Sequence, residues 1–527
     1  MKKAAFVLAL CLGASMPALA QNAEPTQQAL TAKFREIHAA AERGDAEAQF
    51  NLGVMYMRVA HDYVQAAAWY RKAADQGFAE AQYNLGVSYD KGEGVPQDDA
   101  EAAAWYRKAA DQGYADAQNN LGLMYDEGRG VAQDDAQAAA WYRKAADQGY
   151  ANAQNNLGLM YVSGRGVTQD DVQAVAWFRK AVDQGDAKAQ HSLGVMYANG
   201  RGVAQDDVQA VAWFRKAADQ EDANAQHNLG VAYHEGRGVA QDDVQAVAWL
   251  RKAADQGHAE AQFHLGVMYD EGRGVAQDDA RAVAWYRKAA DQGDVNAQFH
   301  LGVRYGKGQG VPQDDTQAVA WYRKAADQGL AEAQYNLGQA YGNNRGVARD
   351  FAQAVVWFRK AADQGLTEAQ YNLGVMYAEG QGVSRDDVQA VAWLRKAAEQ
   401  GLANAQHNLG VMYGEGRGVP QDDVQAVAWF RKAADQGYAD AQHNLGARYS
   451  EGQGVPRDYA QAVAWYRKAA DQGLTVAQFN LGAMYEEGQG VPQDHAQAVA
   501  WYRKAAAQGF THAEEALRKM EASGQVK

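Results

Sequence analysis

Residues 78–113 read FAEAQYNLGVSYDKGEGVPQDDAEAAAWYRKAADQG, and this stretch, repeated along most of the chain, decides the fold. Its first half places Ala81, Leu85 and Tyr89 four residues apart, a spacing that puts three side chains on one face of a helix. Its second half carries a similar apolar face around Trp105. We therefore expect two helices in each stretch, paired as a helical hairpin.

A glycine-rich break separates the two predicted helices. Residues 92–96, Gly-Glu-Gly-Val-Pro, interrupt the apolar pattern, and Asp98 follows where its side-chain oxygen would cap the second helix. Gly113 lies just past the end of that helix, where left-handed backbone is favoured. The first loop glycine recurs in eleven of the twelve full units, and Asn344 replaces it in the twelfth. Because asparagine tolerates left-handed backbone well, we expect a conformational role and not a phosphate cradle.

The repeat has a strict period. All 13 tryptophans fall on one arithmetic progression of step 36, from Trp69 to Trp501. One hairpin cannot bury its own apolar face, so successive units must stack. The sequence therefore predicts an all-α fold, a superhelical α-α solenoid of about 13 helical-hairpin repeats of 36 residues, the first one shorter. The predicted units are 45–77, 78–113, 114–149, 150–185, 186–221, 222–257, 258–293, 294–329, 330–365, 366–401, 402–437, 438–473 and 474–509.

The first twenty residues have the pattern of a signal peptide. Lys2 and Lys3 precede an apolar run at 4–13, and the small residues at 18–20 form a cleavage site. The apolar run is too short to span a bilayer. We therefore expect an exported protein, periplasmic or secreted, with no membrane span.

Two flanking segments are predicted to cap the repeats: 21–44, an N-terminal segment with a capping helix, and 510–527, a C-terminal capping helix and tail. The only cysteine, Cys11, lies in the signal peptide, so the mature chain has no disulfide and no thiol. Lipid attachment at Cys11 is a weaker alternative, because Leu10 stands where a small residue is needed. Cleavage takes the formal charge from −14 to −16, which disfavours nucleic acid and anionic membrane surfaces as partners.

The repeat motif resembles a known family. The run Ala-x-Ala-Gln-x-x-Leu-Gly-x-x-Tyr, the Gly-x-Gly-Val loop, the capping Asp and Trp-(Tyr/Phe)-Arg-Lys-Ala-Ala resemble the Sel-one-like repeat (SLR) family over about residues 45–520. The first unit, with no Gly-x-Gly loop between Tyr56 and Trp69, is similar to a shorter tetratricopeptide-type hairpin. The resemblance implies a right-handed α-solenoid that assembles protein complexes, often at bacterial envelopes or between bacterium and host. In the second unit it rests on Ala81, Leu85, Gly86, Tyr89, Gly92, Gly94, Val95, Asp98, Ala102, Trp105, Ala109, Ala110 and Gly113.

An alternative function also comes from this resemblance, a β-lactamase-like hydrolase related to the cysteine-rich, penicillin-binding members of the family. Ser88 and Lys91 have the Ser-x-x-Lys spacing of serine β-lactamases. Most other units carry Met in place of Ser88, and the supporting Ser-Asp-Asn and Lys-Thr-Gly motifs and the cysteines are missing. We therefore expect no catalytic residue and no cofactor.

The histidines raise the question of a metal site. His191 with His227, and His407 with His443, occupy equivalent positions in neighbouring units. A helical His-x-x-x-His or a carboxylate partner is not evident beside either pair. We therefore expect no metal site.

A basic pair, Arg107-Lys108, recurs in all 13 units and would form a stripe along the second helices. Asp111 follows four residues after Arg107, and twelve units keep an acid there. We expect the stripe to pair with these acids on a solvated face.

The predicted binding surface is the concave surface formed by the first helix of each hairpin, here called helix A. The position of Tyr83 lies about 200° around helix A from Leu85, so it should face away from the core. Aromatic side chains beside the valines one turn later would suit proteins or peptides as partners, although they could equally pack against the adjacent unit. The predicted protein-binding residues are Phe50, Tyr83, His191, His227, Phe263, Phe299, Tyr335, Tyr371, His407, His443 and Phe479.

Overall fold

The structure is a computed structural model that describes residues 27–523. The predicted signal peptide, residues 1–20, lies outside the described residues, as do 21–26 and the last four residues of the chain. The described chain contains 28 α-helices and one π-helix, which confirms the all-α fold. None of the helices described between residues 27 and 523 has the length and apolar character that crossing a membrane requires.

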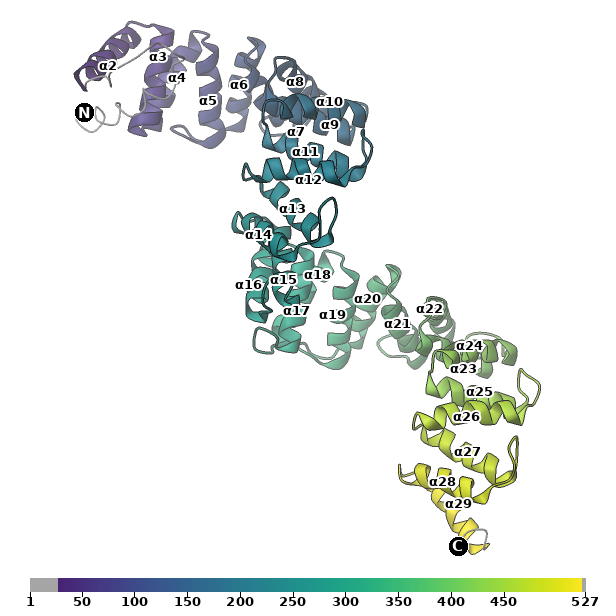
Figure 1. The fold of residues 1–527 in the computed structure, drawn as a ribbon. Helices are drawn as coiled ribbons and strands as arrows, with labels where there is room; N and C mark the ends of the chain where they lie inside the picture. The colour runs from purple at the N-terminus through teal and green to yellow at the C-terminus, as the bar shows by residue number, and fades with distance from the viewer. Residues whose placement is uncertain (1–26, 524–527) are drawn as a thin grey trace. The chain divides into compact units, whose positions relative to one another are not determined.

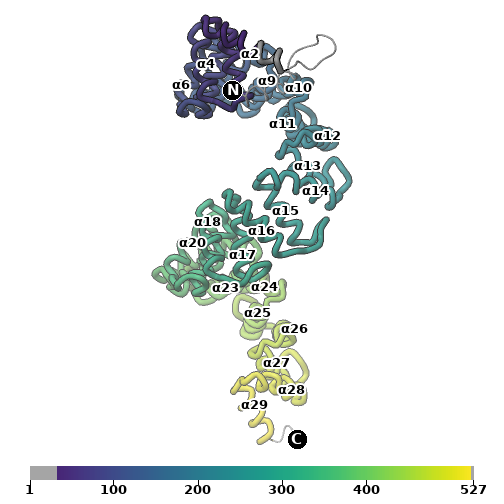
Figure 2. Tube along the Cα trace, turned by 90° about the vertical axis from the view of Figure 1, so that its left-hand side faces the viewer, coloured from purple at the N-terminus to yellow at the C-terminus, as the bar shows by residue number. Residues whose placement is uncertain are grey.

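The chain divides into two compact parts within the repeat at 258–293. The first part runs to Met268 and includes Gly272–Ala276, and the second comprises Tyr269–Glu271 and the chain from Gln277 onward. Within each part, consecutive hairpins stack in chain order (Figures 1 and 2). This confirms the predicted solenoid of helical-hairpin repeats.

The helix boundaries repeat almost identically from unit to unit. The first part holds α2 (Gln27–Glu42), α3 (Ala46–Met55), the π-helix η1 (Tyr56–Ala60), α4 (Tyr63–Asp75), α5 (Ala79–Lys91), α6 (Asp99–Asp111), α7 (Ala115–Glu127), α8 (Asp135–Asp147), α9 (Ala151–Ser163), α10 (Asp171–Val182), α11 (Ala187–Asn199), α12 (Asp207–Ala218), α13 (Ala223–Glu235), α14 (Asp243–Asp255) and most of α15 (Ala259–Glu271). The second part holds α16 (Asp279–Asp291), α17 (Val295–Lys307), α18 (Asp315–Asp327), α19 (Ala331–Asn343), α20 (Phe351–Asp363), α21 (Thr367–Glu379), α22 (Asp387–Glu399), α23 (Ala403–Glu415), α24 (Asp423–Asp435), α25 (Ala439–Glu451), α26 (Tyr459–Asp471), α27 (Thr475–Glu487), α28 (His495–Ala506) and the terminal α29 (Thr511–Ala522).

Most hairpins close through a contact between a glycine and an aromatic ring, and leucine replaces the ring at Leu250 and Leu394. In the second unit, Leu85 of α5 and Tyr106 of α6 are buried, with 0% and 1% of their surface exposed. Gly86 lies against the Tyr106 ring, and a Cβ at Gly86 would come within 2.7 Å of two ring carbons. The absent side chain therefore lets the two helices approach closely, and every full unit keeps glycine at this place.

A ladder of glutamines joins consecutive hairpins. Gln82 Nε2 donates a 3.1 Å hydrogen bond to the Ala74 carbonyl at the end of the preceding hairpin. Gln112, at the end of the second helix of the same hairpin, donates a 2.7 Å hydrogen bond to Gln82 Oε1. All 13 glutamines at the Gln82 position are buried. Because a buried amide must be satisfied, this ladder fixes how one hairpin sits on the last.

The basic pair contacts aromatic rings. Arg107 donates a hydrogen bond to the Tyr125 hydroxyl of the next unit, with its guanidinium 5.5 Å from the ring centroid. Lys108 Nζ lies 3.5 Å from the centroid of the Trp105 ring. The expected partnership with Asp111 is therefore wrong for Arg107, because its long side chain reaches the neighbouring hairpin.

The backbone predictions at the helix ends are confirmed. Asp98 caps α6 by accepting from the backbone of its first turn. Gly92 has φ = 70° at the end of α5, and Asn344 has φ = 56° at the same place in α19. Glu221, which replaces the glycine that ends the second helix in the other units, is also left-handed, with φ = 67°.

Candidate functional site

The predicted binding positions lie along the helix A face, which we define as the surface formed by the first helix of each hairpin, that is, the odd-numbered helices from α3 to α27. Ten of the eleven residues are half-buried, and His227 is buried, with 8% of its surface exposed. The Tyr83 ring lies 5.8 Å from the ring of Tyr106 in its own hairpin and 5.3 Å from that of Tyr114 at the start of the next. Phe479 makes equivalent contacts. The expectation that this position faces away from the core is therefore wrong in part, because rings such as Tyr83 and Phe479 pack between two hairpins.

Burial changes the titration of these side chains. It raises the pKa of Tyr83 to about 12, so the hydroxyl remains protonated and can donate a hydrogen bond. Burial lowers the pKa values of His191, His407 and His443, and it lowers the pKa of His227 to about 3 with help from neighbouring histidines. At neutral pH these imidazoles are uncharged hydrogen-bonding groups.

Asparagine amides, which were not among the predicted binding residues, form a second line along the helix A face. The residue after the aromatic position is asparagine in ten of the 13 units. Asn444 Nδ2 donates to His407 Nε2 at 3.0 Å, and Asn480 Nδ2 donates to His443 Nε2 at 2.9 Å. Each bond joins one hairpin to the next, so the imidazoles of His407 and His443 are held in fixed orientations.

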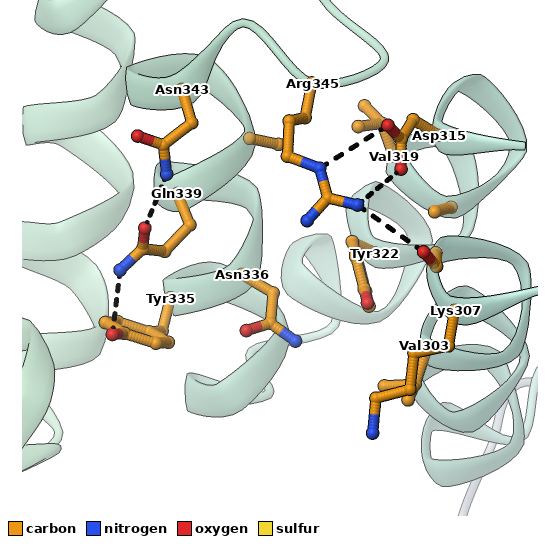
Figure 3. Close-up of a pocket in the computed structure, with 13 residues that line it drawn as sticks. Val303, Lys307, Asp315, Val319, Tyr322, Tyr335, Asn336, Gln339, Asn343 and Arg345 are labelled. Atoms are coloured by element: carbon orange, nitrogen blue, oxygen red, sulfur yellow. Dashed lines mark hydrogen bonds and ion pairs between the residues drawn. The ribbon is translucent and has the colours of Figure 1, made fainter.

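A hollow on the helix A face lies between α17, α18 and α19, with a volume of about 460 Å³. Figure 3 shows Tyr335, Gln339 and Asn343 along α19, where Asn343 donates to Gln339 and Gln339 to the Tyr335 hydroxyl, both at 2.8 Å. On the opposite side, Arg345 pairs with Asp315 of α18 at 2.9 Å. The hollow therefore combines an aromatic ring with amides and an ion pair.

Gly306 of α17 and Gly342 of α19 occupy equivalent positions in successive units, and each leaves an open surface beside it. In the second unit the equivalent residue is Asp90, which accepts a hydrogen bond from Tyr106. At Gly306 the nearest atom to an added Cβ is the Tyr322 hydroxyl at 3.6 Å, and at Gly342 no atom lies within 4 Å. Gly342 lines a second hollow, of about 210 Å³, between α19, α20 and α21.

The lining of these hollows departs from the repeat. Gln339 and Asn343 stand where most units carry valine or leucine and an acidic residue, respectively. Burial raises the pKa of Tyr322 to about 12, so its hydroxyl stays protonated beside Asn336. Amide donors and acceptors next to aromatic rings are suited to a polypeptide segment, whose backbone offers both kinds of partner. The sequence carries a signal for this site, because the unit 330–365 contains both Gln339 and Asn343. The sequence does not show that these residues line the same hollow.

The two residues of the candidate catalytic pair differ in their exposure. Ser88 is buried in α5, with 7% of its surface exposed, while Lys91 is exposed at the end of the same helix. A serine nucleophile has to be reachable by its substrate, and here it packs inside the hairpin.

Comparisons with known proteins agree with this architecture. The chain is 42% identical to a protective antigen present in uropathogenic Escherichia coli strains that displays an SLR fold; the match has a TM-score of 0.71 and covers 81% of this chain and 91% of that one. A Sel1 repeat protein from Oxalobacter formigenes is 38% identical, with a TM-score of 0.48, over 60% of this chain and 94% of that one. No curated protein sequence matches the chain. The Sel1 repeat pattern matches residues 46–78, 79–114, 115–150, 151–186, 187–222, 223–258, 259–294, 295–330, 331–366, 367–402, 403–438, 439–474 and 475–510.

Proposed function

Because this chain belongs to the Sel1 repeat family, whose helical repeats are typically scaffolds for protein binding, we propose that it is an exported adaptor that binds partner proteins along the helix A face. The observation that carries the proposal is the pair of hollows on either side of α19. They lie on the face where the repeats vary, whereas the buried glutamine that joins consecutive hairpins recurs in all 13 units. Variation on one face of a constant framework is the property expected of a surface that selects partners.

The partner we propose is a polypeptide segment that enters the hollow at α17–α19 and continues over α21. Tyr335 and Tyr371 supply aromatic surface in successive units, and Asn336 and Asn372 supply amides beside them. Aromatic anchors flanked by satisfied polar groups carry most of the free energy in protein interfaces. The groups lining the first hollow are already linked to one another, so little side-chain ordering is required on binding.

Export and a role at the cell envelope or in contact with a host belong to the same proposal. The signal-peptide pattern of residues 1–20 supports export. The relative at 42% identity is described as a protective antigen, which supports a location that a host can encounter. Fractionation of producing cells, followed by detection of the processed chain, tests this. Recovery of the unprocessed chain from the cytosol alone would refute it.

We propose no enzymatic activity for the chain. The burial of Ser88 and the exposure of Lys91 favour an accidental Ser-x-x-Lys spacing over a β-lactamase-like hydrolase. Purified protein should hydrolyse nitrocefin no faster than buffer. Turnover that Ser88→Ala abolishes would establish the hydrolase instead.

Site-specific photo-crosslinking in producing cells tests the binding face. p-Benzoylphenylalanine at Tyr335 or Tyr371 should give the same discrete protein adduct. The matched control is Val388, which is 63% exposed on a second helix, α22, and should give no such adduct. An adduct from Val388 but from neither tyrosine would place the binding surface on the other side of the hairpins.

A further inference from the structure

Three histidine rings gather on the helix A face of the first part. His227 lies in α13, His258 caps the N-terminus of α15, and His264 lies in α15. The His227 ring stacks on His258, with centroids 4.9 Å apart and planes 20° from parallel, and its centroid lies 5.2 Å from that of His264. No other unit carries histidine at the position of His258, where Phe, Tyr, Leu or Asp stands instead. The cluster therefore results from substitutions particular to this place in the chain.

The Nε2 atom of His227 distinguishes this cluster from the other helix A histidines. In His191, His407 and His443, Nε2 accepts an asparagine amide of the next unit at 3.0, 3.0 and 2.9 Å. Beside His227 that asparagine is replaced by His264, and Nε2 of His227 is buried without a hydrogen-bond partner. A buried polar atom without a partner is costly, and the His227 ring therefore lacks the asparagine bond that holds the other three rings. An ion would bind its other nitrogen, Nδ1, which lies nearer Glu260. His258 would exchange one existing hydrogen bond for the ion, because Nδ1 accepts from the Ala261 amide at 3.2 Å and Nε2 lies 3.1 Å from Asn224 Oδ1.

A carboxylate completes the set of donors. Glu260 Oε2 lies 3.9 Å from His227 Nδ1. One donor atom from each of His227, His258 and Glu260 lies within 4.8 Å of the other two. Donors around a tetrahedral zinc ion are about 3.4 Å apart, given bond lengths of about 2.0–2.1 Å. The Glu260 side chain is 68% exposed, so it is free to move inward by the remaining distance.

We propose that His227, His258 and Glu260 bind a divalent transition-metal ion of the zinc class. Imidazole nitrogens with one carboxylate oxygen are donors that such ions prefer over the oxygen-only sets of calcium and magnesium. The ring of His264 lies beside His227 and completes the cluster around these ligands. The ion joins α13 to α15 and so fixes the repeat at 222–257 against the start of the next one.

The test is isothermal titration calorimetry of the untagged, processed chain with ZnCl₂ after removal of metal by chelation. We expect one ion per chain and a higher melting temperature with zinc. His258→Leu with Glu260→Asn should bind none, and it should fold because other units carry Leu and Asn at these positions. His443→Asn, a change at the position equivalent to His227, is the matched control and should still bind one ion. The proposal is overturned if the unaltered chain takes up no zinc or if the double variant takes up as much.

A transplanted site gives an independent test. His443 occupies the position of His227 six units later, but Leu474, Val476 and Asn480 stand in place of the other three residues. Leu474→His with Val476→Glu and Asn480→His should raise the stoichiometry from one zinc ion to two. Circular dichroism establishes that the triple variant is folded. A folded triple variant that still binds one ion would contradict the assigned ligands.

Discussion

Replacing Glu221 with glycine should stabilise the protein. Glu221 has φ = 67°, whereas the equivalent glycines of the other twelve units have φ between 83° and 100°. A side chain in the left-handed region costs roughly 1–2 kcal/mol, and glycine costs about 0.5–1 kcal/mol because its unfolded chain is more flexible. The difference predicts that Glu221→Gly raises the free energy of unfolding by roughly 0.5–1 kcal/mol.

Urea denaturation followed by circular dichroism measures the change, and two further variants isolate its cause. Glu221→Ala removes the carboxylate but keeps Cβ, so it should give little of the gain. Gly257→Glu places glutamate at a site with φ = 92° and should destabilise the protein by a similar amount. Because stability in a solenoid is local, Glu221→Gly should also slow amide exchange at the end of α12. If Glu221→Ala stabilises as much as Glu221→Gly, the effect is electrostatic and the backbone explanation is refuted.

Three other predictions concern packing, titration and redox state. Gly302→Ala places Cβ 2.7 Å from an aromatic ring and should lower the free energy of unfolding by roughly 1–3 kcal/mol, whereas Gly342→Ala, with no atom within 4 Å, should be neutral or stabilising. Denaturation curves of the two variants compare them, and equal effects would contradict close packing at Gly302. Burial lowers the pKa values of His407 and His443, so below about pH 6.5 the unfolded chain binds more protons than the folded chain, and the melting temperature should fall as the pH drops from 7.5 to 5. Changing both residues to Asn should make that fall smaller, and an unchanged fall would count against their burial. Because Cys11 is the only cysteine, reductant should leave the melting curve of the processed protein unchanged, and a clear downward shift would be inconsistent with cleavage after residue 20.

The fold could be predicted from sequence because its decisive features are local. The spacing of Leu85 and Tyr89, the capping Asp98 and the left-handed Asn344 each depend on residues close in the chain, and periodicity supplies the rest. Contacts between units were harder to predict. Gln82 and Gln112 recur in every unit, and invariance alone does not show that each glutamine bonds across a junction.

The candidate site likewise depends on contacts between units, which the sequence alone does not reveal. The sequence predicted a binding position at Tyr335, and the structure shows a hollow beside it, which depends on Gly306 lacking a side chain 29 residues earlier. The expectation of no metal site rested on the missing carboxylate partner of the histidine pairs. Glu260 is 33 residues from His227 and comes close to it only when α15 stacks beside α13. Proximity across a repeat junction depends on register in three dimensions, which spacing along the chain does not give.

The most direct test of the central claim is the affinity of the crosslinked partner for the purified chain. Tyr335→Ala with Asn336→Ala removes the aromatic ring and the amide at the hollow, and we expect the dissociation constant to rise at least about tenfold, since central aromatic contacts are typically worth more than 1.4 kcal/mol. Val388→Ala, on an exposed part of α22, should leave it unchanged. Calorimetric titration of the three proteins measures this. Equal affinity for the double variant and the unaltered chain, with both folded, would contradict binding along the helix A face.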